Sequence, residues 1–387
     1  MPVTRFPVFG LLSLAVFFAQ SSCRSKPPVH KEIIYDSIKT IKVDSATEKV
    51  KVSSIIDSIG YVRLGASPVP ISFVDRCICL DHHIVILDGQ VARSVFIFDQ
   101  NGAFQRTIQI GREGKIIRIA DICVDKENKV LYVYAGSENK IFSYDISTGA
   151  KINEIKIAGS FRKISHLNDK FILIRDQIFQ SSGDPGINNP NRIGVFDKKG
   201  TFLYGFLNKS IFEMPENGSL SNIECAFNNS IKISQAYSDT LYELRAGNMY
   251  ALYNLSLLHK NLPHPPILSD TLSEQNYLVW EPVLENKRFM FLNYAIESQF
   301  YTLICDKQSG QFKLIRIILN DIDHIPLSRH FFDINDKRIA EVVYPLELLS
   351  VRDHSIVNSA KAEKLYELCQ GLSAQSNPVI RYLYFRK

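Results

Sequence analysis

The chain has 387 residues, of which 45% are apolar and 22% are charged, and its net charge is +5. This length allows one large domain or two or three small ones, and the apolar content suffices for a sizeable core. Because the Lys and Arg residues are scattered rather than clustered, we expect no nucleic-acid partner. The chain has 17 Tyr and 24 Phe residues but one Trp. Together with many Ile and Val residues, these aromatic residues favour sheet over helix. The sequence therefore predicts an all-β protein.

The N-terminus has the pattern of an export signal. Arg5 supplies a positive charge, and residues 6–19 form a mostly apolar run that is too short to span a bilayer comfortably. Ser21 and Ser22 precede Cys23, as small residues precede the cysteine of a bacterial lipobox. We predict that residues 1–22 are a lipoprotein signal peptide and that Cys23 carries a lipid anchor to the membrane. The alternative is ordinary secretion with cleavage near Ser22 and a free Cys23.

Residues 23–48 are polar, and we interpret them as a flexible tether before a folded region at 49–387. Six cysteines remain, which are too sparse for a disulfide scaffold of the small secreted kind. Most of them lie inside apolar, strand-like runs, where cysteine is usually a small core side chain. These cysteines are Cys77, Cys79, Cys123, Cys225, Cys305 and Cys369.

A repeat of four strand-like segments runs along the chain, and residues 119–157 are its clearest copy. Its third segment ends in an aromatic residue and Asp, a turn with Gly follows, and the fourth segment alternates polar and apolar residues. In the copy before it, the turn contains the pair Asn101-Gly102, a strong hairpin signal. The four segments of the clearest copy are 119–125, 130–135, 140–145 and 151–157.

Repeats of this kind predict a β-propeller with four-stranded blades. Five copies can be counted after residue 71, and the C-terminal region is long enough for a sixth. The strand-like runs 59–64 and 379–385 are left over at the two ends, so we predict that they pair and close a six-bladed ring. Residues 361–368 look helical and are interpreted as an insertion before the last strand. Two separate β domains, divided near residues 256–273, are the alternative.

Several of these segments resemble a known family. The succession Ile86-Leu-Asp88, Phe96-Ile-Phe-Asp99 and Asn101-Gly102, followed by Gly111-Arg-Glu-Gly-Lys115 and Asp121-Ile-Cys-Val-Asp125, is similar to the six-bladed β-propeller lipoproteins of Bacteroidetes. Those proteins in turn resemble NHL-repeat and TolB-like propellers. Gly111 and Gly114 match the first glycines of the family segment Gly-x-Gly-Pro-Gly-Glu-Tyr, and its Pro-Gly-Glu-Tyr part is missing. The resemblance implies a lipid-anchored protein of the outer membrane or periplasm, and it specifies a fold rather than a reaction.

Two groups of residues could in principle bind metal ions or transfer protons. Cys77 and Cys79 would point to one face of a strand and His82 to the other, so a site that also includes His83 is not expected. A pair of carboxylates in residues 321–324, with the sequence Asp-Ile-Asp-His, lacks the glycine and further ligands of a calcium loop and is interpreted as a solvated turn. No hydrolase, metalloprotease or phosphate-loop motif is found, and no cofactor or metal is expected.

The connection from one propeller blade to the next is the best candidate for ligand contact. Such connections commonly lie where ligands enter the central channel, and the turn-rich insertion 176–191 is a further surface loop. The predicted ligand-binding residues, which we expect near that mouth, are Arg112, Glu113, Lys115, Arg118 and Asp121.

The absence of a recognisable catalytic set favours a binding or scaffolding role over catalysis. We expect the propeller to recognise a protein, glycan or peptide in the cell envelope. One alternative is an envelope hydrolase or lyase whose site lies in the central funnel. The other is a structural module of an outer-membrane uptake complex.

Overall fold

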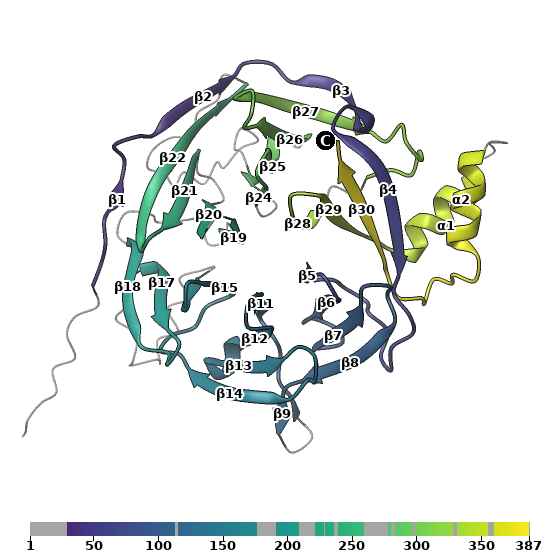
Figure 1. Ribbon diagram of the computed structural model, residues 1–387. Coiled ribbons are helices and arrows are strands. Elements are labelled where there is room, and N and C mark those ends of the chain that lie inside the picture. The colour runs from purple at the N-terminus through teal and green to yellow at the C-terminus, as the bar shows by residue number, and fades with distance from the viewer. Residues whose placement is uncertain are drawn as a thin grey trace, which may run out of the picture.

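The computed structural model is a closed ring of six antiparallel β-sheets around a central axis (Figure 1). It confirms the six-bladed β-propeller, and the two-domain alternative is wrong because the blades on both sides of residues 256–273 belong to one ring. The structure describes residues 29–112, 115–175, 191–208, 221–227, 229–235, 239–258, 278–279, 283–296, 299–327, 331–354 and 360–386.

The first three blades follow the predicted repeat, with the first strand of each nearest the axis. Blade 1 consists of β5 (Arg76–Cys79), β6 (His83–Asp88), β7 (Ser94–Asp99) and β8 (Phe104–Gln109). Blade 2 consists of β11 (Asp121–Asp125), β12 (Val130–Ala135), β13 (Lys140–Asp145) and β14 (Lys151–Lys156). Blade 3 consists of β15 (Lys163–Leu167), β16 (Lys170–Ile174), β17 (Asn191–Asp197) and β18 (Phe202–Asn208).

The last three blades depart more from the repeat. Blade 4 consists of β19 (Ser221–Phe227), β20 (Ser230–Gln235), β21 (Thr240–Arg245) and β22 (Asn248–Leu257). Blade 5 has an inner edge in two pieces and consists of β23 (Leu278–Val279), β24 (Leu284–Glu285), β25 (Phe289–Ile296), β26 (Gln299–Asp306) and β27 (Gln311–Leu319). Blade 6 consists of β28 (Phe331–Ile334), β29 (Arg338–Val343), β30 (Val379–Phe385) and β4 (Ile56–Arg63).

Blade 6 closes the ring, because its outer strand comes from the N-terminal part of the chain. β4 pairs antiparallel with β30, with Arg63 opposite Val379 and Ile59 opposite Leu383. The predicted pairing of the two leftover runs is therefore confirmed. Closure gives β30 a partner on its outer side, so that strand does not present an open sheet edge that would invite aggregation.

The segment predicted as a tether over residues 23–48 differs from that prediction where the structure describes it. β1 (Ile33–Ile34) and β2 (Lys39–Val43) pair in parallel with β22, and β3 (Thr47–Lys51) pairs in parallel with β27. Figure 1 shows these strands running around the outside of the ring toward β4. We call residues 29–51 the belt. Half-buried apolar side chains such as Ile33 and Ile41 pack against the blades, which is why this polar segment is held on the edges.

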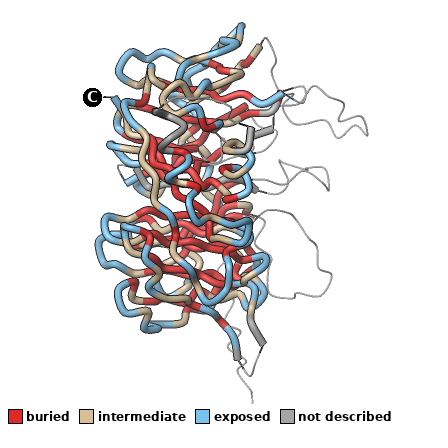
Figure 2. The backbone as a smooth tube through the Cα atoms, turned by 90° about the vertical axis from the view of Figure 1, so that its right-hand side faces the viewer, coloured by how far each residue is buried: buried red, intermediate tan, exposed pale blue. Residues whose placement is uncertain are grey.

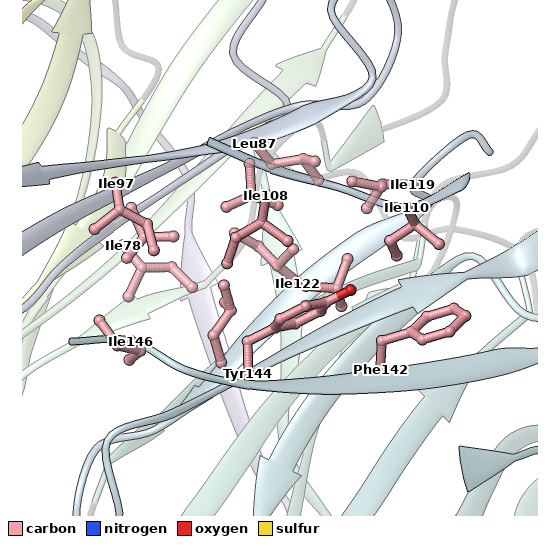
Figure 3. Close-up of a cluster of buried hydrophobic side chains, with 14 of the residues drawn as sticks. Ile78, Leu87, Ile97, Ile108, Ile110, Ile119, Ile122, Phe142, Tyr144 and Ile146 are labelled. Atoms are coloured by element: carbon pink, nitrogen blue, oxygen red, sulfur yellow. The ribbon is translucent and has the colours of Figure 1, made fainter. Parts of the chain in front are cut away.

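The core lies between neighbouring blades. Six clusters of buried apolar side chains fill the six spaces between adjacent sheets. Figure 3 shows the cluster between blades 1 and 2, where Leu87 and Ile108 of blade 1 face Ile122, Phe142 and Tyr144 of blade 2. In the edge-on view of Figure 2, buried segments fill the middle of the ring and exposed turns lie at its surface.

The helical insertion predicted before the last strand is confirmed and is larger than expected. α1 (Pro345–His354) and α2 (Ala360–Cys369) lie between β29 and β30 and project outside the ring (Figure 1). Leu348 and Leu365 pack with Val379 at the edge of blade 6. Two 3-10 turns, η1 (Val52–Ser54) and η2 (Gly136–Glu138), complete the described elements. None of the described helices has the length and apolar character needed to cross a membrane.

Candidate binding face

The two faces of the ring differ in their connections. Because each blade is an antiparallel meander, successive connections alternate between the faces. One face carries short turns such as 100–103, 146–150 and 198–201, and we call it the short-turn face. The other carries the connections between blades and the insertion with α1 and α2, and we call it the long-loop face.

The aromatic-Asp motif of the repeat belongs to the short-turn face. The Oδ1 atom of Asp99 accepts hydrogen bonds from the backbone N–H groups of Asn101 and Ala103, at 2.9 and 2.8 Å. Asp197 does the same for Lys199 and Thr201. The backbone N–H and hydroxyl of Thr148 bind Asp145 and lower the pKa of its carboxyl group. The repeated aspartates thus close turns.

The long-loop face of blade 1 exposes apolar side chains. Phe73 is 46% exposed and Val91 is 62% exposed. The backbone N–H groups of both residues donate to the buried carboxylate of Asp88, so the two loops lie together. Leu346, which is 62% exposed, follows Tyr344, whose hydroxyl accepts a hydrogen bond from the N–H of Val74. We call Phe73, Val91 and Leu346 the apolar patch. Contiguous exposed apolar groups can mark interaction surfaces.

The predicted ligand-binding residues do not form one group at the channel mouth. Arg112 and Lys115 lie in β9 (Gly111–Arg112) and β10 (Lys115–Ile116), which pair as a hairpin. Figure 1 shows β9 outside the ring, beyond β8 and β14, so the predicted position of this hairpin is wrong. Arg118 is exposed on the connection that follows, and Glu113 lies outside the described residues.

Asp121, the fifth predicted residue, is buried. Its Oδ2 atom accepts hydrogen bonds from Nη1 of Arg76 in blade 1 and from the N–H of Ile164 in blade 3, both at 2.9 Å. Because its carboxylate is only 1% exposed, it joins blades rather than facing solvent. Ligand contact by Arg112, Glu113, Lys115 and Arg118 stays a prediction. Cys23, the predicted lipidation site, lies outside the described part of the chain. So do residues 176–190 of the predicted insertion 176–191.

The cysteines and histidines of residues 77–83 do not form one group, as their spacing in the sequence predicted. Cys77 and Cys79 are buried side by side, with 3.8 Å between their Sγ atoms. Their mutual hydrogen bond and burial raise the pKa of the Cys77 thiol. His82 is exposed in the turn that follows β5, and His83 begins β6. Within the described ranges, no three His, Cys, Asp or Glu side chains are grouped so that they could hold a metal ion.

The carboxylates near residue 321 brace the ring closure. Asp321 accepts hydrogen bonds from the backbone N–H and the hydroxyl of Ser53. Asp323 accepts one from the hydroxyl of Tyr61 in β4. The guanidinium of Arg381 in β30 donates to the carbonyl oxygen of Ile325. The turn is therefore fixed against both closing strands.

Polar side chains on the two strands nearest the axis connect neighbouring blades. The carboxylate of Asp333 in blade 6 accepts the N–H of Cys79 in blade 1 at 2.9 Å. Lys232 of blade 4 forms an ion pair with Glu285 of blade 5, at 3.0 Å. Together with the Arg76–Asp121 pair, these contacts use the charges near the axis to fix one blade against the next. Burying a charge is costly unless the charge is paired or hydrogen-bonded, and each of these charged side chains has such a partner in the next blade.

A cleft of about 370 Å³ opens between blades 1 and 2. Phe142 and Tyr144 line it, and their rings also pack in the cluster drawn in Figure 3. Lys140 and Lys151 both form ion pairs with Glu154 in its wall, the second at 2.9 Å. With Glu138, the lining holds two lysines and two glutamates, so its formal charges sum to zero.

Sequence reasoning missed a pair of arginines on the long-loop face of blade 3. The backbone N–H of Arg175 donates to the carbonyl oxygen of Arg192 at 2.9 Å, continuing the β16–β17 ladder one residue past the Ile174–Ile193 pair. Directly opposed residues of an antiparallel pair point to one side of the sheet, so the two side chains leave the same side of blade 3. Only the strand register brings together residues this far apart in the sequence.

Comparison with known proteins agrees with the fold. The family model described as "Domain of unknown function (DUF4934)" matches residues 38–384. A crystal structure of a Bacteroides fragilis NCTC 9343 protein assigned as exported is 16% identical, with a TM-score of 0.70 over 92% of this chain and 100% of that one. A DUF4221 family member from Bacteroides vulgatus ATCC 8482 is 10% identical, with a TM-score of 0.53 over 86% and 97% of the two chains. No curated protein sequence matches the chain.

Proposed function

The chain belongs to the DUF4934 family, and we propose that it is a cell-envelope binding module that recognises a protein or glycan partner with the long-loop face of its propeller. The observation that carries this proposal is the difference between the two faces. The described long-loop face exposes the apolar patch, whereas the turns opposite are polar and closed by aspartates. The similarity in fold to a Bacteroides protein assigned as exported supports a location in the envelope.

The test is recovery of a partner from envelope extracts by the tagged full chain. We expect the variant Phe73→Glu/Val91→Lys to lose that partner, because it places charges in the apolar patch. The matched control, Asn101→Lys/Lys199→Glu, alters the short-turn face at two exposed positions. Loss of the partner from the control alone would contradict the assignment of the face. Equal recovery with both variants would contradict it as well.

We also propose that Cys23 carries a lipid. The belt makes this anchor short, since the carbonyl oxygen of Val29 already accepts a hydrogen bond from the N–H of Gly205 on blade 3. Between Cys23 and Val29, a fully extended chain spans at most about 20 Å. The rim of blade 3 would then lie close to the membrane, rather than at the end of a long tether.

Metabolic labelling with a fatty acid tests the lipid anchor directly. We expect label on the wild-type chain and none on Cys23→Ala, which should leave the membrane fraction. Cys225→Ala, which leaves the predicted lipobox intact, is the control. Retention of label by Cys23→Ala would refute the proposal.

A further inference from the structure

Blades 1 and 3 receive the chain from the preceding blade in the same way. In blade 1 the N–H of Asp75 donates to the carbonyl oxygen of Leu87, and in blade 3 the N–H of Arg162 donates to that of Ile174. One residue earlier, the N–H groups of Val74 and Phe161 each donate to a tyrosine hydroxyl, both at 2.9 Å. Ser72 and Phe73 of blade 1 therefore correspond to Gly159 and Ser160 of blade 3.

In blade 1 a carboxylate fills the space beside this connection. The Oδ2 atom of Asp88 accepts hydrogen bonds from the N–H groups of Ser72 and Phe73, at 2.9 and 3.1 Å. Asp88 follows Leu87, just as Arg175 follows Ile174. Blade 3 thus has a cation at the position where blade 1 has an anion.

This exchange leaves donors without acceptors in blade 3. The N–H groups of Gly159 and Ser160 find no hydrogen-bond acceptor among the described residues. The Nε and Nη2 atoms of Arg175 are buried and also lack a hydrogen-bond partner. Gly159 has φ +112, and a Cβ atom there would lie 2.8 Å from Nη2, so the glycine keeps this space open. An unpaired buried donor is costly, and several that converge call for an acceptor.

The ring of Phe161 also positions the Arg175 side chain. Arg192 lies directly opposite Arg175 in the strand register. The guanidinium of Arg175 stacks on the ring of Phe161 at 4.9 Å, which orients it without neutralising it. Burial lowers the pKa of Arg175 and lowers that of Arg192 to about 10. Ser160 is exposed, so solvent reaches the edge of the group.

We propose that the long-loop face of blade 3 binds an oxyanion, a carboxylate or phosphate group of the envelope ligand, between the N–H groups of Gly159 and Ser160 and the guanidinium group of Arg175. The anion takes the position that the carboxylate of Asp88 occupies in blade 1. Planar guanidinium groups bind carboxylates and phosphates through paired, charge-assisted hydrogen bonds. The biological role of this site rests on the proposed function of the face, whereas the site itself rests on the donors just described.

The experiment measures the melting temperature and heat of binding of the full chain with inorganic phosphate and with glucuronate. Sodium chloride at equal ionic strength and neutral glucose are the blanks. We expect one or both anions to raise the melting temperature above the chloride blank, since a ligand of the folded state stabilises it. Binding of phosphate alone indicates a phosphate-bearing ligand, and binding of glucuronate alone indicates a carboxylate.

Three variants separate a binding site from a structural role. Arg175→Gln should weaken anion binding about tenfold or more, as expected for the loss of a charge-assisted hydrogen bond. Arg175→Asp copies blade 1, so it should abolish the anion response while keeping or raising the melting temperature without anion. Arg93→Gln, an exposed position on the same face of blade 1, is the control and should bind like the wild type.

Absence of any anion effect on the wild type, or an unchanged response of Arg175→Gln, would overturn the proposal. Lower stability of Arg175→Asp without anion would do so too, because it would show that the cation is structural. If the anion binds but no partner is recovered, the site stands and the proposed function falls. If the partner binds Arg175→Gln and the wild type equally and neither responds to anions, the proposed anion site is refuted and the proposed binding function of the face remains.

Discussion

At the scale of single residues, the closure of the ring contains a fully buried ion pair. The Nε atom of Arg381 lies 2.6 Å from Oε2 of Glu341, and neither side chain is exposed. We expect Glu341→Gln to lower the free energy of unfolding by about 3–5 kcal/mol, because it leaves the Arg381 charge buried without a counter-ion. Urea unfolding followed by tryptophan fluorescence or circular dichroism measures the change.

A surface pair provides the control for that variant. Arg316 and Glu48 are both largely exposed, and Glu48→Gln should cost less than about 1 kcal/mol. The double variant Arg381→Met/Glu341→Leu should recover much of the loss, because it removes both charges together. A loss for Glu341→Gln no larger than that for Glu48→Gln would show that water reaches Arg381.

The turn aspartates predict how the stability of the folded protein changes as the pH falls. Hydrogen bonds from Thr148 lower the pKa of Asp145 in the folded protein. A group with a lowered folded pKa contributes stability above its unfolded pKa of about 3.9, and that stability is lost as the pH falls through the folded value. We expect the urea midpoint of Asp145→Asn to fall less steeply between about pH 5 and pH 3 than that of the wild type. Parallel curves would contradict this.

Residue patterns show what the sequence could reveal about the site. The aromatic-Asp motif could be found because each copy occupies the same place in a repeat, although only the structure shows Asp99 and Asp197 binding turn N–H groups. The sequence places Asp121 next to a connection between blades, which predicts a surface position. It is buried because its carboxylate pairs with Arg76 of another blade, and the sequence does not reveal that pairing. The Arg175–Arg192 pair could not be found, because strand register is set by three-dimensional pairing.

At the scale of elements, the belt gives the clearest prediction. Ile41 and Val43 of β2 lie opposite Leu255 and Leu257 of β22 and are half-buried against the core between blades 4 and 5. We expect Ile41→Ala/Val43→Ala to cost about 1–3 kcal/mol of unfolding free energy, below the range for fully buried side chains. Amide hydrogen exchange along the outer edge of β22 should accelerate. The control, Lys42→Ala, changes the exposed position between them.

Unchanged exchange in the double variant would mean that these residues form a tether in solution, as first expected. The belt escaped sequence analysis because its strands read Lys-Thr-Ile-Lys-Val and Thr-Glu-Lys-Val-Lys, which are polar and short. Their pairing is parallel and uses the outermost edge of blades that are already complete. By contrast, residues 59–64 and 379–385 were recognisable because they are apolar strands without a partner in the repeat.

At the scale of the whole molecule, stability depends on closing the ring through β30. This strand pairs with β29 on one side and β4 on the other, so its loss would separate the N-terminal strand from blade 6. It would also open the cores on both sides of that blade, where Ile380 and Leu383 are buried. A chain that ends at Pro378 should therefore expose two sheet edges and aggregate, because unpaired edges template pairing between molecules.

The measurement is the yield of monomer by size exclusion with light scattering. Removal of Arg386 and Lys387 alone serves as the control, since it leaves every residue of β30 in place. Addition of a peptide with residues 379–387 during refolding should restore monomer to the truncated chain, because the peptide supplies both missing ladders. If the truncated chain is monomeric and unfolds in a single transition without the peptide, the remaining contacts between blades suffice. Closure by β30 would then contribute only local stability.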